Sequence, residues 1–263
     1  MEWTAIQQHI HFFFHNTTTS TIMTAATASF AKAMSAGARY YGAVTLPLYD
    51  LAVLSTVVPY AWQCPLATEQ ALYNKHVAHS RHHLDVGVAT GYFLKHASSW
   101  NKHPKPSLTL MDLNPKATQY AARRLQPTSH FSSIRQITGD AREPFPVHDD
   151  TKFGSIGLFH LLHCIPGDLT EKGVVLQNAA RVLHEDGVVF GANVTPDDSN
   201  SPKNLFAQSV LAVSHALGAL NNQRDSHQDM EQILEDTFHD YEIERIGCMS
   251  LWSARNPKKD QDE

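Results

Sequence analysis

The stretch that decides the fold reads Leu84-Asp85-Val86-Gly87-Val88-Ala89-Thr90-Gly91-Tyr92-Phe93-Leu94. An apolar strand segment passes through a turn of small residues directly into a helical segment. Glycine in such a turn lets the backbone approach a ligand, and the electropositive start of the helix favours an anionic group, although a tight turn alone would also need glycine. The spacing is Asp-x-Gly-x-Ala-x-Gly rather than GxGxxG, because Ala89 replaces the second glycine and Tyr92 follows Gly91. This turn is therefore poorly suited to bind the pyrophosphate of a dinucleotide.

Acidic residues follow the next two strand segments. Asp112 ends the segment 107–112, and Asp140 follows the segment 132–137. A carboxylate at the tip of the second strand can accept both hydroxyls of a ribose, and it can also cap the helix that begins at Pro115. Asp140 is placed to accept from an adenine amino group. Because the carboxyl ends of parallel strands meet at one edge of a sheet, the glycine turn and both acids predict one ligand crevice.

Short apolar runs alternate with helical segments from Arg81 onward, which is typical of βαβ units. We therefore predict an α/β fold with a Rossmann-like, seven-stranded, mostly parallel sheet and an antiparallel last strand. Because the last two strand segments are nearly adjacent, we expect a hairpin that places an antiparallel strand at the sheet edge. The strand segments are 83–87, 107–112, 132–137, 153–159, 187–194, 241–247 and 249–254, and the helical segments are 92–99, 115–125, 170–184, 204–220 and 226–237.

The chain before Arg81 has a different pattern. Residues 1–22 combine an aromatic and His patch with a Thr-Ser run, a composition that predicts a loose N-terminal tail. Residues 23–80 have a helical pattern, with one apolar segment over 46–58 that ends at Pro59 and a helix over 66–77. His82 and His83 are expected to form an exposed pair.

Composition and motifs exclude several function classes. The 263 residues carry 21 basic and 26 acidic side chains, and the formal charge of −5 argues against a nucleic-acid partner. No stretch approaches the ~20 apolar residues that a membrane span needs. The three cysteines form no CxxC pair, and no fourth ligand accompanies His160, His163 and Cys164, so we predict no metal site. Without a recognisable signal peptide, a cytoplasmic location is expected. Nothing in the sequence indicates the oligomeric state.

Residues 81–255 resemble a class I S-adenosylmethionine-dependent methyltransferase. The resemblance rests on the motif 85–91, on Asp112 and Asp140, and on the run Phe159-His160-Leu161-Leu162-His163-Cys164-Ile165-Pro166-Gly167. This last run also resembles small-molecule methyltransferases of fungal secondary metabolism. The resemblance implies that S-adenosylmethionine is bound by Asp85, Gly87, Ala89, Gly91, Asp112, Leu113, Asp140, Ala141 and Phe159. The family usually has glycine where Ala89 stands, so the extra methyl group could crowd the cofactor carboxylate, yet we expect binding to survive.

The same resemblance implies two lids over a methyltransferase domain of residues 81–263. These are the N-terminal helical region 23–80 and an insertion at about 196–240, which would exclude water from the reaction. Tyr41 is expected to contact the cofactor, and Tyr49, His160, His215 and Asn222 the acceptor. The alternative for the tyrosines is ordinary packing of their rings, and for the insertion a helix that faces solvent.

Methyl transfer requires mainly that two reactants are positioned, because the cofactor carries an activated methyl group. A base is needed only for a protonated acceptor such as a phenol, and His163 is the first candidate, against a structural role as a buried histidine. The sequence thus predicts methyl transfer to O or N of a small, natural-product-like molecule. Two alternatives stay open: a pericyclase-like enzyme of this fold that transfers no methyl, and a non-catalytic binding protein.

Overall fold

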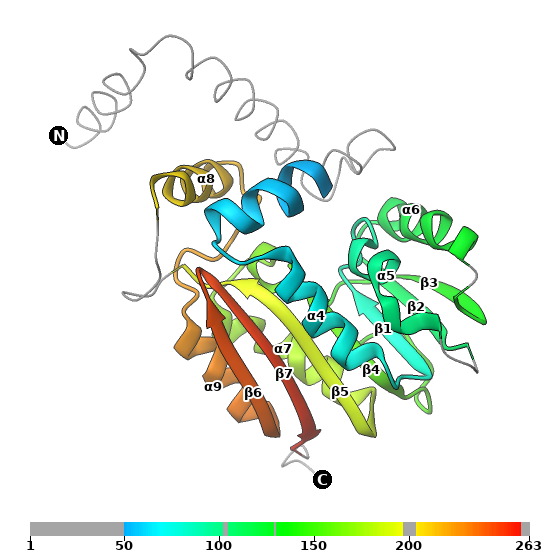
Figure 1. Ribbon diagram of the computed structural model, residues 1–263. Coiled ribbons are helices and arrows are strands. Elements are labelled where there is room, and N and C mark those ends of the chain that lie inside the picture. The colour runs from blue at the N-terminus through cyan, green and yellow to red at the C-terminus, as the bar shows by residue number, and fades with distance from the viewer. Residues whose placement is uncertain (1–49, 102–104, 129, 197–203, 259–263) are drawn as a thin grey trace, which may run out of the picture.

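The computed structural model describes residues 50–101, 105–128, 130–196 and 204–258 (Figure 1). The expected tail 1–22, the first part of the expected lid, and Tyr41 and Tyr49 lie outside the described residues.

In the described part of the chain, seven strands form one sheet with the order β3-β2-β1-β4-β5-β7-β6. The first five strands are parallel, and β7 pairs antiparallel with both β5 and β6. The predicted α/β fold with an antiparallel last strand is confirmed. The hairpin lies at the edge as expected, but the antiparallel strand β7 sits one position inward, and β6 forms the edge. The strands are β1 (His82–Val86), β2 (Ser107–Asp112), β3 (Ser133–Thr138), β4 (Phe153–Phe159), β5 (Leu183–Val194), β6 (Phe238–Ile246) and β7 (Met249–Pro257).

Helices cover both faces of the sheet (Figure 1). One face carries η1 (Asp50–Ala61), α4 (Leu66–Val77), α5 (Tyr92–His96) and α6 (Pro115–Leu125), and the other carries α7 (Leu169–Arg181) and α9 (His227–Thr237). Helix α8 (Leu205–Ala216) contacts η1. Short 3-10 turns are η2 (Ser98–Asn101), η3 (Gln126–Thr128) and η4 (Leu162–Cys164).

Pro59 does not end the first described helix, contrary to the prediction. Helix η1 is a wide π-type helix that continues to Ala61 and closes with the Trp62 N–H donating to the Val57 carbonyl at 3.0 Å. Proline lacks a donor and its ring clashes with the carbonyl four residues back in an α-helix, and pairing over five residues relieves that clash.

Alternate residues of each central strand face two separate hydrophobic cores. In β5, Phe190 belongs to the core under η1 and α4, whereas Val189 belongs to the core under α7 and α9. In β1, Leu84 faces α7 and α9, so His83 and Asp85 point to the opposite face, toward α4. The expectation that His83 is exposed is therefore wrong: the side chain is fully buried, because β1 is a central strand.

Candidate functional site

The turn between β1 and α5 has a left-handed backbone at three alternating residues. The φ angles are +73° at Gly87, +45° at Ala89 and +66° at Gly91. A Cβ atom on Gly87 would lie 2.8 Å from Cδ1 of Leu161, so the turn packs directly against the segment that follows β4. Backbone conformation and close packing therefore both require glycine at this position.

Asp112 lies at the tip of β2 and holds the same turn in place. Its Oδ2 accepts the Ala89 N–H at 3.1 Å, and its Oδ1 accepts the Asn114 N–H at 2.9 Å. Burial raises the pKa of this carboxyl group, and the two backbone donors oppose that rise. Each carboxylate oxygen has two lone pairs, so Asp112 keeps acceptor capacity for the two hydroxyls of a ribose. The neighbouring Leu113 is 58% exposed and offers an apolar contact beside that acid.

Asp85 is the innermost acid of the site and is held by a buried chain of hydrogen bonds. The Tyr73 hydroxyl donates to Asp85 Oδ2 at 2.6 Å, and His83 Nε2 lies 2.9 Å from the same hydroxyl. Because that hydroxyl proton points to Asp85, His83 donates from Nε2 and accepts at Nδ1 from the Ser155 hydroxyl, 2.7 Å away. Burial, and then the Asp85 charge, raise the pKa of Tyr73 well above its ordinary value. The chain fixes a carboxylate where a ligand ammonium group can bind.

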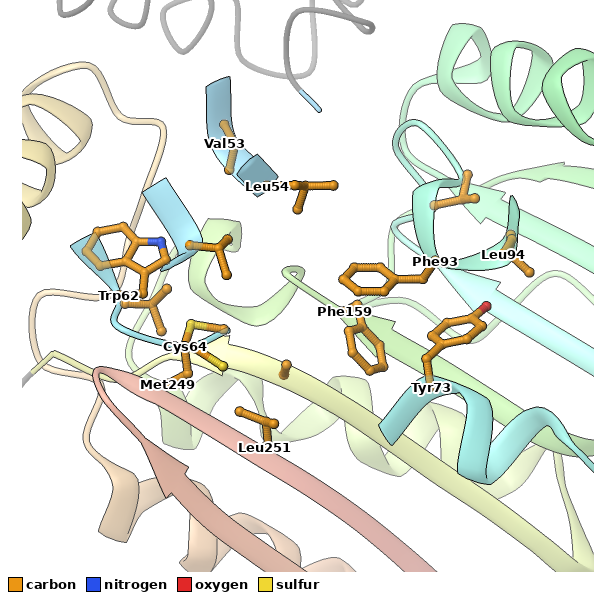
Figure 2. Packing of buried hydrophobic residues seen from close by; sticks show 14 of the residues in the cluster. Val53, Leu54, Trp62, Cys64, Tyr73, Phe93, Leu94, Phe159, Met249 and Leu251 are labelled. Carbon is orange, nitrogen blue, oxygen red and sulfur yellow. The ribbon is translucent and has the colours of Figure 1, made fainter. Parts of the chain in front are cut away.

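A narrow cavity of about 40 Å³ lies against the glycine turn. Asp85, Phe159 and His160 line it from the sheet, and Leu54 lines it from η1. Figure 2 shows Phe93, Phe159 and Tyr73 gathered between α4 and the turn, with Leu54 toward them from η1. A ligand as large as S-adenosylmethionine would fill more than this cavity and extend along the open sheet edge at Asp112.

Asp50 fastens η1 to the glycine turn. Its Oδ1 accepts the Thr90 hydroxyl at 2.6 Å, and its Oδ2 accepts the Arg124 guanidinium from α6 at 2.5 Å. The two contacts hold Leu54 over the cavity. Asp50 has no counterpart among the sequence predictions, because its partners, in the glycine turn and in α6, lie 40 and 74 residues away in the sequence.

The predicted adenine acid, Asp140, is paired with a cation. Arg142 donates from Nε to Oδ1 at 3.1 Å and from Nη2 to Oδ2 at 2.6 Å, and these hydrogen bonds lower the pKa of Asp140. Ala141 is buried beside it, and Phe159 lines the cavity. A role for Asp140 and Ala141 in cofactor binding stays a prediction.

His163 lies behind the cavity lining and is almost fully buried. Its Nδ1 accepts the Val194 N–H at 3.0 Å, and its carbonyl accepts the Asn221 N–H at 2.8 Å. Burial lowers the pKa of the ring well below 6.5, so the ring is neutral. These contacts join η4 to β5 and to the insertion, and they favour the structural role over the role of base.

The polar residues expected to orient an acceptor from the insertion point inward. Asn222 is fully buried, where its Nδ2 donates to the Val194 carbonyl at 2.9 Å and its Oδ1 pairs with His215 Nε2 at 2.9 Å. Lys172 and Asp225 form a second buried link of this kind at 2.7 Å. The Asn222 amide fixes the insertion to β5, and His215 is engaged in the same link. A role of these two residues in substrate binding stays a prediction.

The sequence interpretation missed two polar residues of α4, Glu69 and Tyr73. They are four residues apart, so they share the helix face that packs on the sheet, and both are fully buried. Glu69 pairs with His160, whose Nε2 lies 2.6 Å from its Oε2. The signal that could have identified them is the presence of polar residues on the face of a helix that is expected to be buried.

In the described part of the chain, no group of three His, Cys, Asp or Glu side chains is arranged to hold a metal ion. Among the same residues, no helix combines the length and the apolar character that crossing a membrane requires.

Comparison with known proteins agrees with this geometry. Residues 84–191 match the family described as a methyltransferase domain. The chain is 33% identical to demethylluteothin O-methyltransferase of Streptomyces thioluteus, over 80% of this chain and 86% of that protein. It is 32% identical to the physcion biosynthesis cluster O-methyltransferase of Aspergillus chevalieri, over 84% and 96% of the two chains.

The fold is also similar to that of a solved methyltransferase with its cofactor. Human N-acetylserotonin methyltransferase in complex with SAM superposes with a TM-score of 0.56 at 17% identity, over 83% of this chain and 58% of that one. The glycine turn, the acid at the tip of β2 and the strand order are those that the resemblance to this family implies. The chain therefore belongs to the methyltransferases, as a class I enzyme that uses S-adenosylmethionine.

Proposed function

We propose that this enzyme methylates an oxygen or nitrogen atom of a small, natural-product-like acceptor. The observation that carries the proposal is the cavity at the glycine turn, where the buried acid Asp85 and the aromatic Phe159 meet a second polar group, His160. A lining in which a few polar groups stand among apolar side chains is of the kind that binds a small organic molecule. The two relatives named above, one for demethylluteothin and one for physcion biosynthesis, support an acceptor of this class.

Each part of S-adenosylmethionine would find a suitable residue in this site. When bound, the cofactor supplies a methyl group already activated on a sulfonium. Asp85 would accept hydrogen bonds from the methionine ammonium, Asp112 from the ribose hydroxyls, and Leu113 would pack on the adenine. The N–H groups of Gly87 and Gly91 donate to the carbonyls of Met111 and Val88, at 2.8 Å each, so the left-handed turn would offer the cofactor a close backbone surface rather than free donors.

The remaining roles follow from the same proposal. Helix η1 would act as a lid, supported by Leu54 in the cavity lining and by the contacts of Asp50. Helix α8 would support that lid from the insertion, since it contacts η1. The net charge of −5 favours a small-molecule acceptor over a nucleic acid. The described cysteines form no disulfide bond, which is in keeping with a cytoplasmic enzyme.

Titration calorimetry with S-adenosylmethionine and S-adenosylhomocysteine, with NAD as control, tests the cofactor. Incubation with methyl-labelled S-adenosylmethionine and a panel of small phenols and amines, including the matched pair 2-naphthol and 2-naphthylamine, then tests transfer. We expect binding of both sulfur compounds, no binding of NAD, and labelled product. Cofactor binding without transfer to any acceptor would favour the pericyclase-like alternative, and no cofactor binding would favour a binding protein.

A further inference from the structure

His160 and Glu69 form an enclosed pair at the inner end of the cavity. Glu69 comes from α4 and His160 from the end of β4, and their Oε2 and Nε2 atoms lie 2.6 Å apart. The Glu69 side chain is fully buried and the His160 side chain is 8% exposed, on the cavity side. Burying a carboxylate is unfavourable unless it has a partner, so the fold uses His160 to hold Glu69.

Three observations distinguish this pair from a purely structural link. His160 has a left-handed backbone, with φ at +55°, a conformation that histidine adopts at a cost in free energy. Its ring stacks on Phe93, with centroids 6.0 Å apart and planes 12° apart, which keeps the ring facing the cavity. The second carboxylate oxygen of Glu69, Oε1, is buried and has no N–H or O–H donor among the described residues, and the Cys64 thiol lies beside this carboxylate. A pair selected only for stability would satisfy that oxygen and relax that backbone.

The geometry also fixes which ring nitrogen is free. Because the Glu69 carboxylate accepts from Nε2, the proton of the neutral ring is on Nε2 and the lone pair is on Nδ1. Nδ1 has no hydrogen-bond partner among the residues that the structure describes. The other titratable groups nearest the pair are Cys64 ahead of α4, His163 on η4 and Asp85 on β1. In the neutral form of the ring, Nδ1 can therefore accept a proton from a bound acceptor.

We propose that His160 is the general base of the reaction and that Glu69 is the residue that positions it. The inference rests on the proposed function and assigns to its site the acceptors that must lose a proton, such as phenols. The acceptor O–H proton passes to Nδ1 while an oxygen electron pair forms the new bond to the methyl carbon. The electron pair of the broken carbon–sulfur bond stays on sulfur, and the resulting imidazolium, stabilised by the Glu69 carboxylate, later releases its proton to water.

The first test needs no acceptor. Nitrogen-15 NMR of the histidine rings, assigned with the variant His160→Gln, reports which nitrogen carries the proton. We expect the His160 proton on Nε2 in the wild type and a mixture of both tautomers in Glu69→Gln. The exposed pair of His148 and Asp150, 2.7 Å apart, is the matched control, because Glu69→Gln should leave its signals unchanged. A proton on Nδ1 of His160 in the wild type would overturn the proposal.

The second test compares two phenols of similar shape and different acidity, 2-naphthol and its more acidic 6-cyano derivative. We expect His160→Gln to lower kcat with 2-naphthol by about 100-fold or more, and to lower it much less with the acidic phenol. Glu69→Gln should change kcat in the same direction by a smaller factor, and His148→Gln should change nothing. The affinity for S-adenosylhomocysteine is expected to stay near that of the wild type in every variant. The thermal midpoint should also stay near it, because in His160→Gln the side-chain amide can still donate a hydrogen bond to the buried Glu69 carboxylate.

Two results would contradict the inference. An equal loss with both phenols, or a loss that follows weakened S-adenosylhomocysteine binding or unfolding, would assign the pair a structural role; His160→Asn, with a shorter amide, repeats the comparison if the glutamine variant unfolds. If the wild type binds S-adenosylhomocysteine but methylates no acceptor of the panel, the proposed function fails instead, and the tautomer measurement alone decides the state of the pair.

Discussion

Ala89 provides a sharp test of how the glycine turn is built, through the substitution Ala89→Gly. Its φ of +45° is a left-handed conformation that alanine, with its Cβ, adopts at a cost. The same residue donates its N–H to Asp112 Oδ2, so the turn cannot relax without losing a contact of the site. The protein therefore carries strain at a position where glycine would have none.

The size of the effect follows from two opposing terms. A left-handed backbone costs alanine about 1–2 kcal/mol, which glycine would recover. Glycine loses more conformational freedom on folding, which costs about 0.5–1 kcal/mol. The net expectation is that Ala89→Gly stabilises the fold by about 0.5–1 kcal/mol, equivalent to about 1–4 °C in Tm for a chain of this size. Because the substitution removes a methyl group from the cavity lining, the affinity for S-adenosylhomocysteine should stay equal or rise.

Differential scanning calorimetry and titration calorimetry measure the two quantities. Ala71→Gly is the matched control, since Ala71 is exposed in the middle of α4, where the same chemical change should destabilise the fold by ~1 kcal/mol. Opposite signs in the two variants support the interpretation. A lower Tm in Ala89→Gly, comparable to that of the control, would refute the argument that the turn is strained at Ala89.

Three further predictions concern other parts of the molecule. Asp112→Ala should weaken S-adenosylhomocysteine binding by about 1–3 kcal/mol, because ribose hydroxyls lose their acceptor; unchanged affinity in calorimetry would remove Asp112 from the site. Lys172→Met should lower the free energy of unfolding by about 3–5 kcal/mol, because it leaves Asp225 charged and buried; urea denaturation should show that the double variant Lys172→Met/Asp225→Leu regains much of this loss. Burial lowers the pKa of His76 from 6.5 to about 4, so its contribution to stability is present above pH 6.5 and is lost as the pH falls toward 4. At pH 5 the loss should reach about 2 kcal/mol by urea denaturation, and His76→Gln should lack this part of the acid sensitivity.

The sequence predicted those parts of the fold in which local pattern and tertiary environment agree. The ranges 107–112 and 153–159 are strands with the predicted bounds, because each is a mainly apolar segment inside the sheet that is buried on both faces. Helix 115–125 also has its predicted bounds, since Asn114 caps it by accepting the Lys116 N–H and Pro115 opens it. The segment 204–220 was predicted too long, because Gly218 has a left-handed backbone and the helix ends at Ala216.

The glycine turn and Asp112 could be assigned from the sequence because topology alone brings them together. β1 and β2 are parallel neighbours, so the residues after their carboxyl ends must lie side by side, and the Ala89 N–H does donate to Asp112. No such topological rule applies to the insertion at 196–240. From the sequence, its polar residues could either bind a ligand or form hydrogen bonds in the protein interior. In the structure, Asn222 is buried and donates a hydrogen bond to the Val194 carbonyl of β5.

The roles of the two histidines after β4 could not be separated from the sequence, because their directions depend on a backbone conformation that the sequence does not reveal. His160 and His163 are three residues apart, with rings 5.5 Å apart and nearly perpendicular. The left-handed turn at His160 directs one ring to the cavity, while the other accepts a backbone N–H of β5. The carboxylate that distinguishes them, Glu69, lies 91 residues earlier on a helix outside the family motifs. A search for a base within the motif therefore finds His163 first, whereas the buried face of α4 identifies the histidine that has a carboxylate partner.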